Sequence, residues 1–218
     1  CRSSRVSQRR TASLEGRIPR RYRGVSFDRP PVPGMPEPVV SAVRAYVRTL
    51  RKRLAQGRGL WLVGDIGTGK TTLAMIISKA AMDAGYSAAI YSLPRLLNIL
   101  RDSIDSPGGK LDLIERLTAV DLLHLDDLGA ERDTAWVLEQ LYSIINARYE
   151  SERAILATTN LTPDLLAEQI GARTVSRLME MCGDPLPLFG DDKRQRLPLS
   201  TPDTEHSALA LHGQTGSL

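Results

Sequence analysis

The stretch that decides the fold is Gly64-Asp65-Ile66-Gly67-Thr68-Gly69-Lys70-Thr71. It matches the pattern G-x-x-x-x-G-K-[ST], whose glycines let backbone N–H groups approach phosphate oxygens closely. A chance match in a chain of this kind has a frequency on the order of one in a hundred. The flanks strengthen the match, because residues 60–63 form an apolar run typical of a buried strand and residues 71–84 are typical of an apolar helix. We therefore predict a phosphate-binding loop, with a ligand-free glycine turn as the weaker alternative.

The residues of this loop have expected tasks. The N-terminus of the following helix offers partial positive charge to phosphates. Lys70 is expected to reach the β- and γ-phosphates of ATP, and the hydroxyl of Thr71 to ligate Mg²⁺. The predicted ATP-binding residues are Gly64, Asp65, Ile66, Gly67, Thr68, Gly69, Lys70, Thr71 and Thr72.

An acidic pair follows an apolar run at 122–125, Leu-Leu-His-Leu, which is predicted to be part of a strand. The carboxyl end of a parallel strand lies beside the phosphate loop, so Asp126 is expected to hold Mg²⁺ through water and Asp127 to orient the attacking water. Alone, two adjacent acids would indicate a turn or a helix cap; the loop upstream favours the metal role. His124 lies inside the strand and is expected to be a core histidine.

A third polar element, Thr158-Thr159-Asn160, ends another apolar run. A polar group there would lie beside the γ-phosphate, where Asn160 could sense it or position the water. A helix cap before Pro163 explains the same residues equally well.

The order of apolar runs predicts an α/β fold, a doubly wound parallel sheet of about five strands. The predicted strands are 60–63, 87–93, 121–125, 154–158 and 185–189, and the predicted helices are 71–84, 94–104, 110–118, 133–150, 162–169 and 173–181. An amphipathic helix over 40–54 is expected to lead into this core, because Val40, Val43, Val47, Leu50 and Leu54 recur at helical spacing.

Charge and proline content divide the chain. Residues 1–24 hold eight Arg and one acid although the whole chain carries only +4, so the remaining residues are slightly acidic. Such an arm is either a nucleic-acid or acidic-partner contact or simply a solvated leader. Five prolines at 30–38 predict an extended linker. The expected organisation is a basic arm and linker over 1–38, an ATPase domain over 39–197 and a disordered tail over 198–218.

Cysteine content and hydropathy favour a cytoplasmic protein. The chain has two Cys, no apolar run long enough to cross a bilayer, and no secretory pattern. It begins with Cys1 instead of Met, so we expect either that residues are missing upstream, which we favour, or that processing exposed this Cys.

These parts, in this order, resemble the AAA+ superfamily. The segments 125–131, 145–149 and 158–161 are similar to those of DnaC/DnaI-type replicative helicase loaders and of the related IstB transposition helpers. The segment 21–28 resembles the lead-in to that ATPase domain, and 190–194 its closing G-x-x-x-R element. The resemblance covers roughly residues 20–195.

The resemblance also implies an arginine finger in the segment 173–178. Arg177 would reach the γ-phosphate held by a neighbouring subunit, and Arg173, one turn away, is the competitor. Both could instead form ion pairs on a solvated helix face. The proposed catalytic set is therefore Asp127, Asn160 and Arg177.

The chain departs from the family pattern in two respects. The second acid is Asp127 where many AAA+ ATPases carry Glu, so slow hydrolysis is expected. Little room remains after the fifth strand for a C-terminal helical lid, and Arg194 is a candidate to substitute in part for the residue that such a lid would supply.

The resemblance implies an ATP- and Mg²⁺-dependent ATPase that helps place a replicative DNA helicase on single-stranded DNA and self-associates through shared ATP sites. The alternatives are a transposition helper ATPase and, less well supported, a P-loop small-molecule kinase. Arg95, Arg101 and Lys110 are candidates for contacting DNA, since the corresponding region faces DNA in the related clade, although they could be ordinary surface charges.

Overall fold

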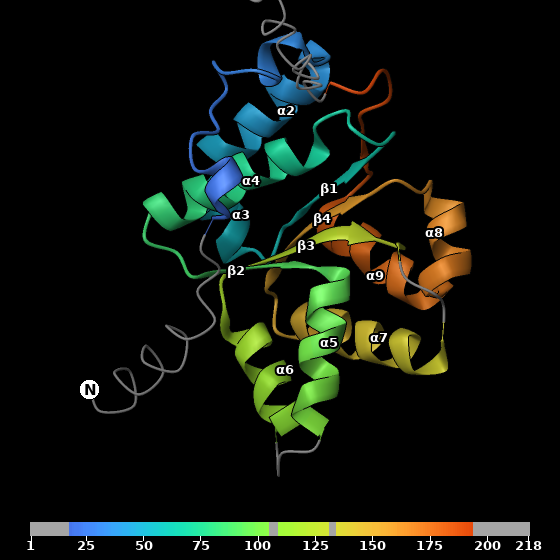
Figure 1. Cartoon of the computed structure of the whole chain (residues 1–218). Coiled ribbons are helices and arrows are strands. Elements are labelled where there is room, and N and C mark those ends of the chain that lie inside the picture. The colour runs from blue at the N-terminus through green and yellow to red at the C-terminus, as the bar shows by residue number, and fades with distance from the viewer. Residues whose placement is uncertain (1–17, 105–108, 131–133, 194–218) are drawn as a thin grey trace, which may run out of the picture.

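The computed structural model describes residues 18–104, 109–130 and 134–193, and its centre is a five-stranded parallel sheet (Figure 1). The strand order is β2-β3-β4-β1-β5, and every neighbouring pair is parallel. The strands are β1 (Leu60–Val63), β2 (Ala88–Ser92), β3 (Leu122–Leu128), β4 (Ala154–Thr159) and β5 (Leu186–Pro187). The predicted doubly wound α/β fold is therefore confirmed.

Helices cover both faces of this sheet (Figure 1). One face carries α2 (Glu37–Arg48), α3 (Leu50–Ala55) and α4 (Lys70–Asp83). The other face carries α5 (Leu93–Ile104), α6 (Gly109–Ala119), α7 (Ala135–Glu150), α8 (Pro163–Ile170) and α9 (Ala172–Cys182). None of the helices in the described ranges is long and apolar enough to cross a membrane.

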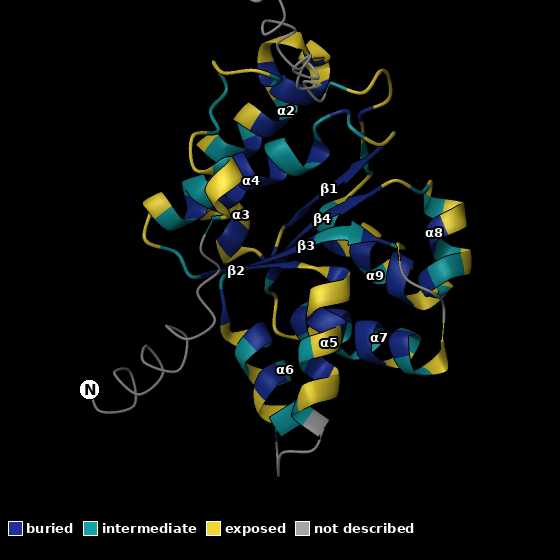
Figure 2. Cartoon of the chain, in the orientation of Figure 1, coloured by how far each residue is buried: buried dark blue, intermediate teal, exposed yellow. Residues whose placement is uncertain are grey.

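Two hydrophobic clusters, one on each face, hold these layers together. Alternate residues of a strand point to opposite faces, so β1 sends Leu62 to the cluster under α4 and Trp61 to the cluster under α7 and α9. The strands are buried on both faces, as Figure 2 shows in dark blue, and this explains why their sequences are continuous apolar runs.

The region before β1 differs from the prediction. The expected single helix over 40–54 begins earlier, at Glu37, and is interrupted at Thr49, whose hydroxyl donates to the carbonyl of Ala45 at 2.8 Å. The proline-rich stretch is not simply extended: Val32–Gly34 forms a short 3₁₀ turn, and Val32 and Met35 are buried in the core. Two apolar side chains between the prolines are enough to fix this stretch to the domain.

Other boundaries moved by smaller amounts. Strand β3 runs on through Asp126 and Asp127 to Leu128, because its end continues to pair with β4 after an irregularity between Leu125 and Leu128. Strand β5 is reduced to Leu186–Pro187. In the described part of the chain no helical lid follows β5; the predicted tail over 198–218 and Arg194 lie outside the described residues.

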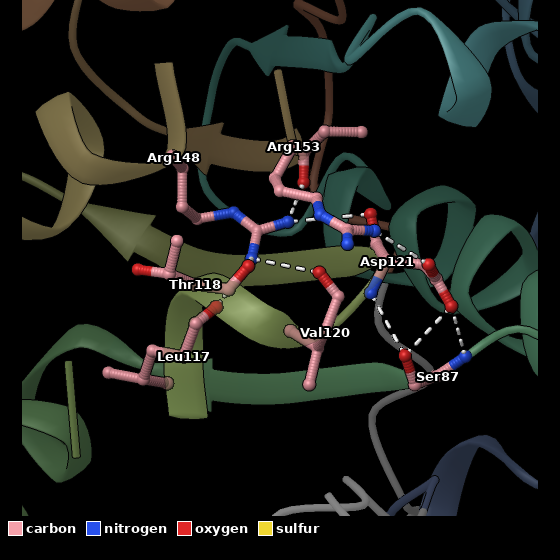
Figure 3. A network of polar contacts seen from close by, with 8 residues as sticks. Ser87, Leu117, Thr118, Val120, Asp121, Arg148 and Arg153 are labelled. Carbon is pink, nitrogen blue, oxygen red and sulfur yellow. Dashed lines mark hydrogen bonds and ion pairs between the residues drawn. The ribbon is translucent and has the colours of Figure 1, made fainter. Parts of the chain in front are cut away.

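Arg148 of α7 ties three elements together and is fully buried (Figure 3). Its guanidinium donates to the carbonyls of Leu117 and Val120 at the end of α6, and to the carbonyl of Ala154 in β4 at 2.7 Å. A cation at this position satisfies carbonyls that a helix end leaves unpaired and matches the negative end of the helix dipole. Burial lowers the pKa of this guanidinium. The segment 145–149 thus has a structural reason for its Arg.

Candidate nucleotide-binding site

A pocket of 710 Å³ lies where the phosphate loop meets the carboxyl ends of β3 and β4. It is the place where a doubly wound sheet positions a ligand. Of the predicted ATP-binding residues, Ile66, Gly67, Gly69, Lys70, Thr71 and Thr72 line it. The other predicted site residues in its lining are Asp126, Asp127 and Asn160.

The phosphate loop has the backbone that its glycines allow. Gly67 and Gly69 have φ of 81° and 103°, values that favour glycine. A Cβ at Gly67 would collide with the Asp192 carboxylate, and one at Gly69 with the Met35 side chain. Nζ of Lys70, on a buried side chain, donates to the carbonyls of Gly64 at 2.9 Å and Asp65 at 2.6 Å. The ammonium is therefore held inside the loop, at the start of α4.

The segment after β5 supports this loop from outside. The backbone N–H of Gly190 donates to Oδ2 of Asp65 at 3.1 Å, and the N–H of Lys193 donates to the carbonyl of Gly67 at 2.9 Å. Within the loop, the hydroxyl of Thr68 donates to the carbonyl of Asp65 at 2.8 Å. The phosphate loop is therefore held by a hydrogen bond of its own and by two from the segment after β5.

Asp126 is surrounded by donors. Its Oδ1 accepts from the hydroxyls of Thr71 at 3.0 Å and Thr158 at 2.7 Å, and Nε2 of His124 lies 3.7 Å away. Burial alone would raise the pKa of Asp126, but the imidazole of His124 and the two hydroxyls outweigh it and lower the pKa. The carboxylate is thus held ionised beside Thr71.

His124 is buried as predicted, but it is more than core filling. Its Nδ1 lies 3.0 Å from the hydroxyl of Ser78 in α4, and its Nε2 is buried without a hydrogen-bond partner in the described structure. With the proton on Nε2, Ser78 donates to Nδ1 and the free N–H points toward Asp126.

Asp127 and Asn160 are joined directly. Nδ2 of Asn160 donates to Oδ1 of Asp127 at 2.9 Å, and the N–H of Asp127 donates to the hydroxyl of Thr158 at 2.9 Å. Asp127 has φ of 64°, a left-handed conformation in which Asp and Asn are the best tolerated side chains. This geometry presents the Asp127 carboxylate to the pocket at the irregularity in β3.

Arg177 does not lie in this pocket. Its guanidinium carbon is 3.9 Å from the centre of the Tyr149 ring, and the Tyr149 hydroxyl donates to Oε2 of Glu180 at 2.7 Å. Arg173 is exposed on the same helix, α9. Neither arginine contributes to the nucleotide pocket of its own chain.

The three candidate DNA contacts differ in their surroundings. Arg95 is exposed at the start of α5. Arg101 lies with its guanidinium carbon 4.9 Å from the centre of the Trp136 ring, and Nζ of Lys110 is 3.7 Å from Oε1 of Glu139. Two of the three cations are therefore engaged by α7.

Sequence reasoning missed part of the pocket wall. Arg21, Tyr22, Val25, Pro30 and Pro31 line it, although they precede the predicted ATPase domain. Lys193 also lines it, next to the Arg194 that the sequence singled out. The likeness of segment 21–28 to a domain lead-in was the available signal for Arg21, Tyr22 and Val25, and the likeness of 190–194 to a closing element was the signal for Lys193.

Residues 46–178, more than half of the chain, match the family of IstB-like ATP binding proteins. The chain belongs to this family. The AAA+ core expected from the sequence is thereby confirmed, and the arrangement of phosphate loop, acidic strand and polar strand end is that of an ATPase family.

The relatives of this IstB-like chain include helicase loaders. Replicative helicase loader DnaI of Bacillus subtilis is 26% identical over 154 residues, which cover 64% of the chain and 48% of DnaI, so the chain spans about half of that relative. The crystal structure of the DnaC helicase loader superposes with a TM-score of 0.67 at 26% identity, over 78% of the chain and 99% of that structure. The replication initiator DnaA bound to AMPPCP and single-stranded DNA has a TM-score of 0.64 at 20% identity, over 81% of the chain and 52% of that structure, which shows a shared fold.

Proposed function

We propose that this IstB-like protein binds ATP with Mg²⁺ and hydrolyses it slowly, as a helicase-loader-like ATPase acting on single-stranded DNA. The observation that carries the proposal is the convergence on one pocket of Lys70 and Thr71, from the start of α4, with Asp126 and Asp127, from the end of β3. Asn160 completes the set through its hydrogen bond to Asp127. Chance would not bring the five predicted polar residues together at the ligand end of the sheet.

The residues beside the phosphate loop fit Mg²⁺. Thr71 and Asp126 offer a hydroxyl and an ionised carboxylate within 3.0 Å of each other, and Mg²⁺ prefers such oxygen donors together with phosphates and water. Bound there, the ion would neutralise charge on the β- and γ-phosphates. Lys70 would turn from the loop carbonyls to the phosphates, and Asp127, steadied by Asn160, would orient the water.

The pocket wall extends the proposal to the rest of the nucleotide. Tyr22, Val25, Pro30 and Pro31 form an apolar side suited to a base, and Lys193 adds a second cation to the phosphate side. The segment 18–38 would then belong to the nucleotide site, although it is outside the domain predicted over 39–197.

The loader role is favoured over two alternatives. Similarity to DnaI and DnaC supports a replicative helicase as partner, whereas the family match also supports a transposition helper. The nucleotide site is common to both roles. A small-molecule kinase is less well supported, because Arg173 and Arg177 would have to serve an acceptor pocket beside the ATP, and both lie away from it.

Nucleotide binding is tested by Lys70→Ala with a fluorescent ATP analogue. We expect affinity to fall by a factor of about 100, since a buried charge-assisted contact of ~3 kcal/mol is removed. Lys79→Ala on the exposed side of the same helix is the matched control and should bind normally. Unchanged affinity in a folded Lys70→Ala protein would contradict the assignment.

The partner is tested separately. A purified replicative helicase hexamer should be retained by the immobilised protein with ATP and less with ADP, because the γ-phosphate selects one conformation. Single-stranded DNA binding should be weakened more by Arg95→Ala than by Arg101→Ala, since Arg101 already contacts Trp136. Retention of a transposase in place of the helicase would favour the alternative role.

A further inference from the structure

Helices α2 and α3 carry a strongly basic surface that the nucleotide site does not use. Between Glu37 and Asp65 the sequence holds six cations and no acid. Four of them form what we call the α2–α3 basic face: Arg44, Arg48, Arg51 and Lys52, all exposed. Their spacings of three and four residues place them on the outer side, while Val43, Tyr46, Leu50 and Leu54 face the core.

The charges of this basic face are largely unneutralised. Nη2 of Arg44 is 3.8 Å from Oδ1 of Asp28, and the Arg44 guanidinium carbon lies 4.3 Å from the Phe27 ring centre. Arg48, Arg51 and Lys52 form no ion pair with any residue that the structure describes. Asp121 and Glu152 line a shallow groove with Arg51, but Asp121 is paired with Arg153 at 3.0 Å.

We propose that the α2–α3 basic face binds the phosphate backbone of double-stranded DNA, without reading its sequence. Three of the four cations are Arg, whose fork of N–H groups fits a phosphate. Regularly spaced Arg and Lys along a helix are sufficient for such contacts, because backbone binding is driven by charge and counterion release.

The α2–α3 basic face has no exposed large apolar or aromatic side chain on its two helices, and this favours duplex DNA as its partner. A protein interface or a membrane-bound helix needs apolar anchors, yet the exposed large apolar residues of the described chain all lie elsewhere: Ile66, Leu111, Leu165, Met179 and Phe189. Single-stranded DNA needs aromatic platforms for its bases. Tyr46, the only aromatic residue in α2 and α3, is buried, and the half-buried ring of Phe27 beside them is already covered by the Arg44 guanidinium. A duplex, with its bases stacked inside, requires neither.

The α2–α3 basic face is separate from the candidate single-strand contacts at Arg95, Arg101 and Lys110. Helices α2 and α3 lie on the opposite side of the sheet from α5 and α6, which carry the candidate single-strand contacts (Figure 1). Exposed residues on α2 and α3 are seen in yellow in Figure 2. The five further Arg upstream of residue 18 lie outside the residues that the structure describes. One subunit could therefore hold duplex on one face and a separated strand on the other.

The test compares two triple variants of the full chain by fluorescence anisotropy with a short labelled duplex of mixed sequence. Arg48→Ala/Arg51→Ala/Lys52→Ala should weaken duplex binding about tenfold or more at low salt and reduce the slope of log K against log salt by roughly 2 to 3. Arg95→Ala/Arg101→Ala/Lys110→Ala removes the same charge and should leave duplex binding near normal. Arg48→Lys/Arg51→Lys should retain most of the affinity.

Duplex binding by the α2–α3 basic face is expected not to depend on the nucleotide site. Lys70→Ala should bind duplex like the unchanged protein, so failure of the nucleotide site and failure of the basic face are distinguishable. Equal loss in both triple variants would mean that bulk charge alone attracts DNA and would overturn the proposal. The proposal would also be overturned if polyglutamate displaced the duplex at equal charge concentration. A larger loss of affinity for single-stranded DNA than for duplex in the Arg48→Ala/Arg51→Ala/Lys52→Ala variant would overturn it as well.

Discussion

Asn160, just beyond β4, donates a hydrogen bond to the carboxylate of Asp127 in β3 at 2.9 Å. The two residues stand 33 positions apart in the sequence and come from neighbouring strands. Asp127 adopts φ of 64° in doing so, a conformation that costs energy for most side chains. The pair forms a polar edge of the nucleotide pocket.

Asp127→Asn should keep nucleotide binding and slow hydrolysis. Asn tolerates the left-handed backbone as well as Asp does, so the fold should persist, but the amide cannot accept a proton from the attacking water. We expect a loss of about 10²-fold in single-turnover hydrolysis, measured beside binding of an ATP analogue. Loss of nucleotide binding in Asp127→Asn but not in Asp126→Asn would mean that the two acids have exchanged roles.

Asn160→Ala tests whether the two residues act as a unit. If Asn160 works by orienting Asp127, the double variant should hydrolyse no more slowly than Asp127→Asn alone. Independent, multiplicative losses would show that Asn160 touches the nucleotide or the water by itself.

His124→Leu should weaken Mg²⁺ binding while leaving Mg²⁺-free nucleotide binding unchanged. The imidazole attracts Oδ1 of Asp126 from 3.7 Å, and residues behind a metal-bound carboxylate commonly change metal affinity 10- to 100-fold. The measurement is a Mg²⁺ titration of analogue binding, with a thermal melt as control for folding. Ser78→Ala should shift the titration in the same direction but less. An unchanged Mg²⁺ midpoint in folded His124→Leu would leave His124 a packing residue.

Arg148→Ala should destabilise the fold without touching the pocket. The change leaves buried carbonyls of Leu117, Val120 and Ala154 without their donor, which costs roughly 3 kcal/mol or more. Urea unfolding should show the loss. Arg148→Lys should recover little, because one ammonium cannot reach the carbonyls both at the end of α6 and in β4. Arg153→Ala, which removes only the partly exposed ion pair to Asp121, should cost less than about 1 kcal/mol.

The sequence predicted the strands and the phosphate-side residues because these depend on local signals. Runs of four apolar residues mark β1 and β4, and the spacing of Gly69, Lys70 and Thr71 is fixed by one loop. The acids could be assigned to this loop because parallel strands end at one edge of the sheet.

The remainder of the site depends on contacts between distant segments, which no local pattern encodes. The Gly190 N–H reaches Asp65 across 125 positions, and this contact brings Lys193 to the pocket. Val32 and Met35 anchor the segment that carries Tyr22 and Pro31 to the pocket wall, although prolines there predicted an extended linker. His124 was correctly predicted to be buried, but its approach to Asp126 depends on how Ser78 in α4 orients the ring.

The arginine finger stays a prediction, and its position defines how it can be tested. Arg177 stacks on Tyr149 of its own chain and is absent from its own nucleotide pocket, so it can meet a γ-phosphate only in a neighbouring subunit. Arg177→Ala should therefore leave ATP binding near normal and reduce hydrolysis. A finger contributes ~10³-fold or more in related enzymes, and we expect less here because Asp127 indicates a slow site.

Mixing variants separates a shared site from a local one. The Lys70→Ala protein keeps Arg177 but lacks a working pocket, and the Arg177→Ala protein keeps the pocket but lacks the finger. In a mixed interface the pocket of the Arg177→Ala subunit meets the intact Arg177 of the Lys70→Ala subunit, so hydrolysis should recover in part when the two proteins are combined. If Arg173 is the finger instead, partial recovery should be seen when Lys70→Ala is mixed with Arg173→Ala. Hydrolysis per subunit should also rise with protein concentration. A rate per subunit that is constant across a wide dilution series, without recovery on mixing, would mean that Arg177 serves only to pack against Tyr149 in α7.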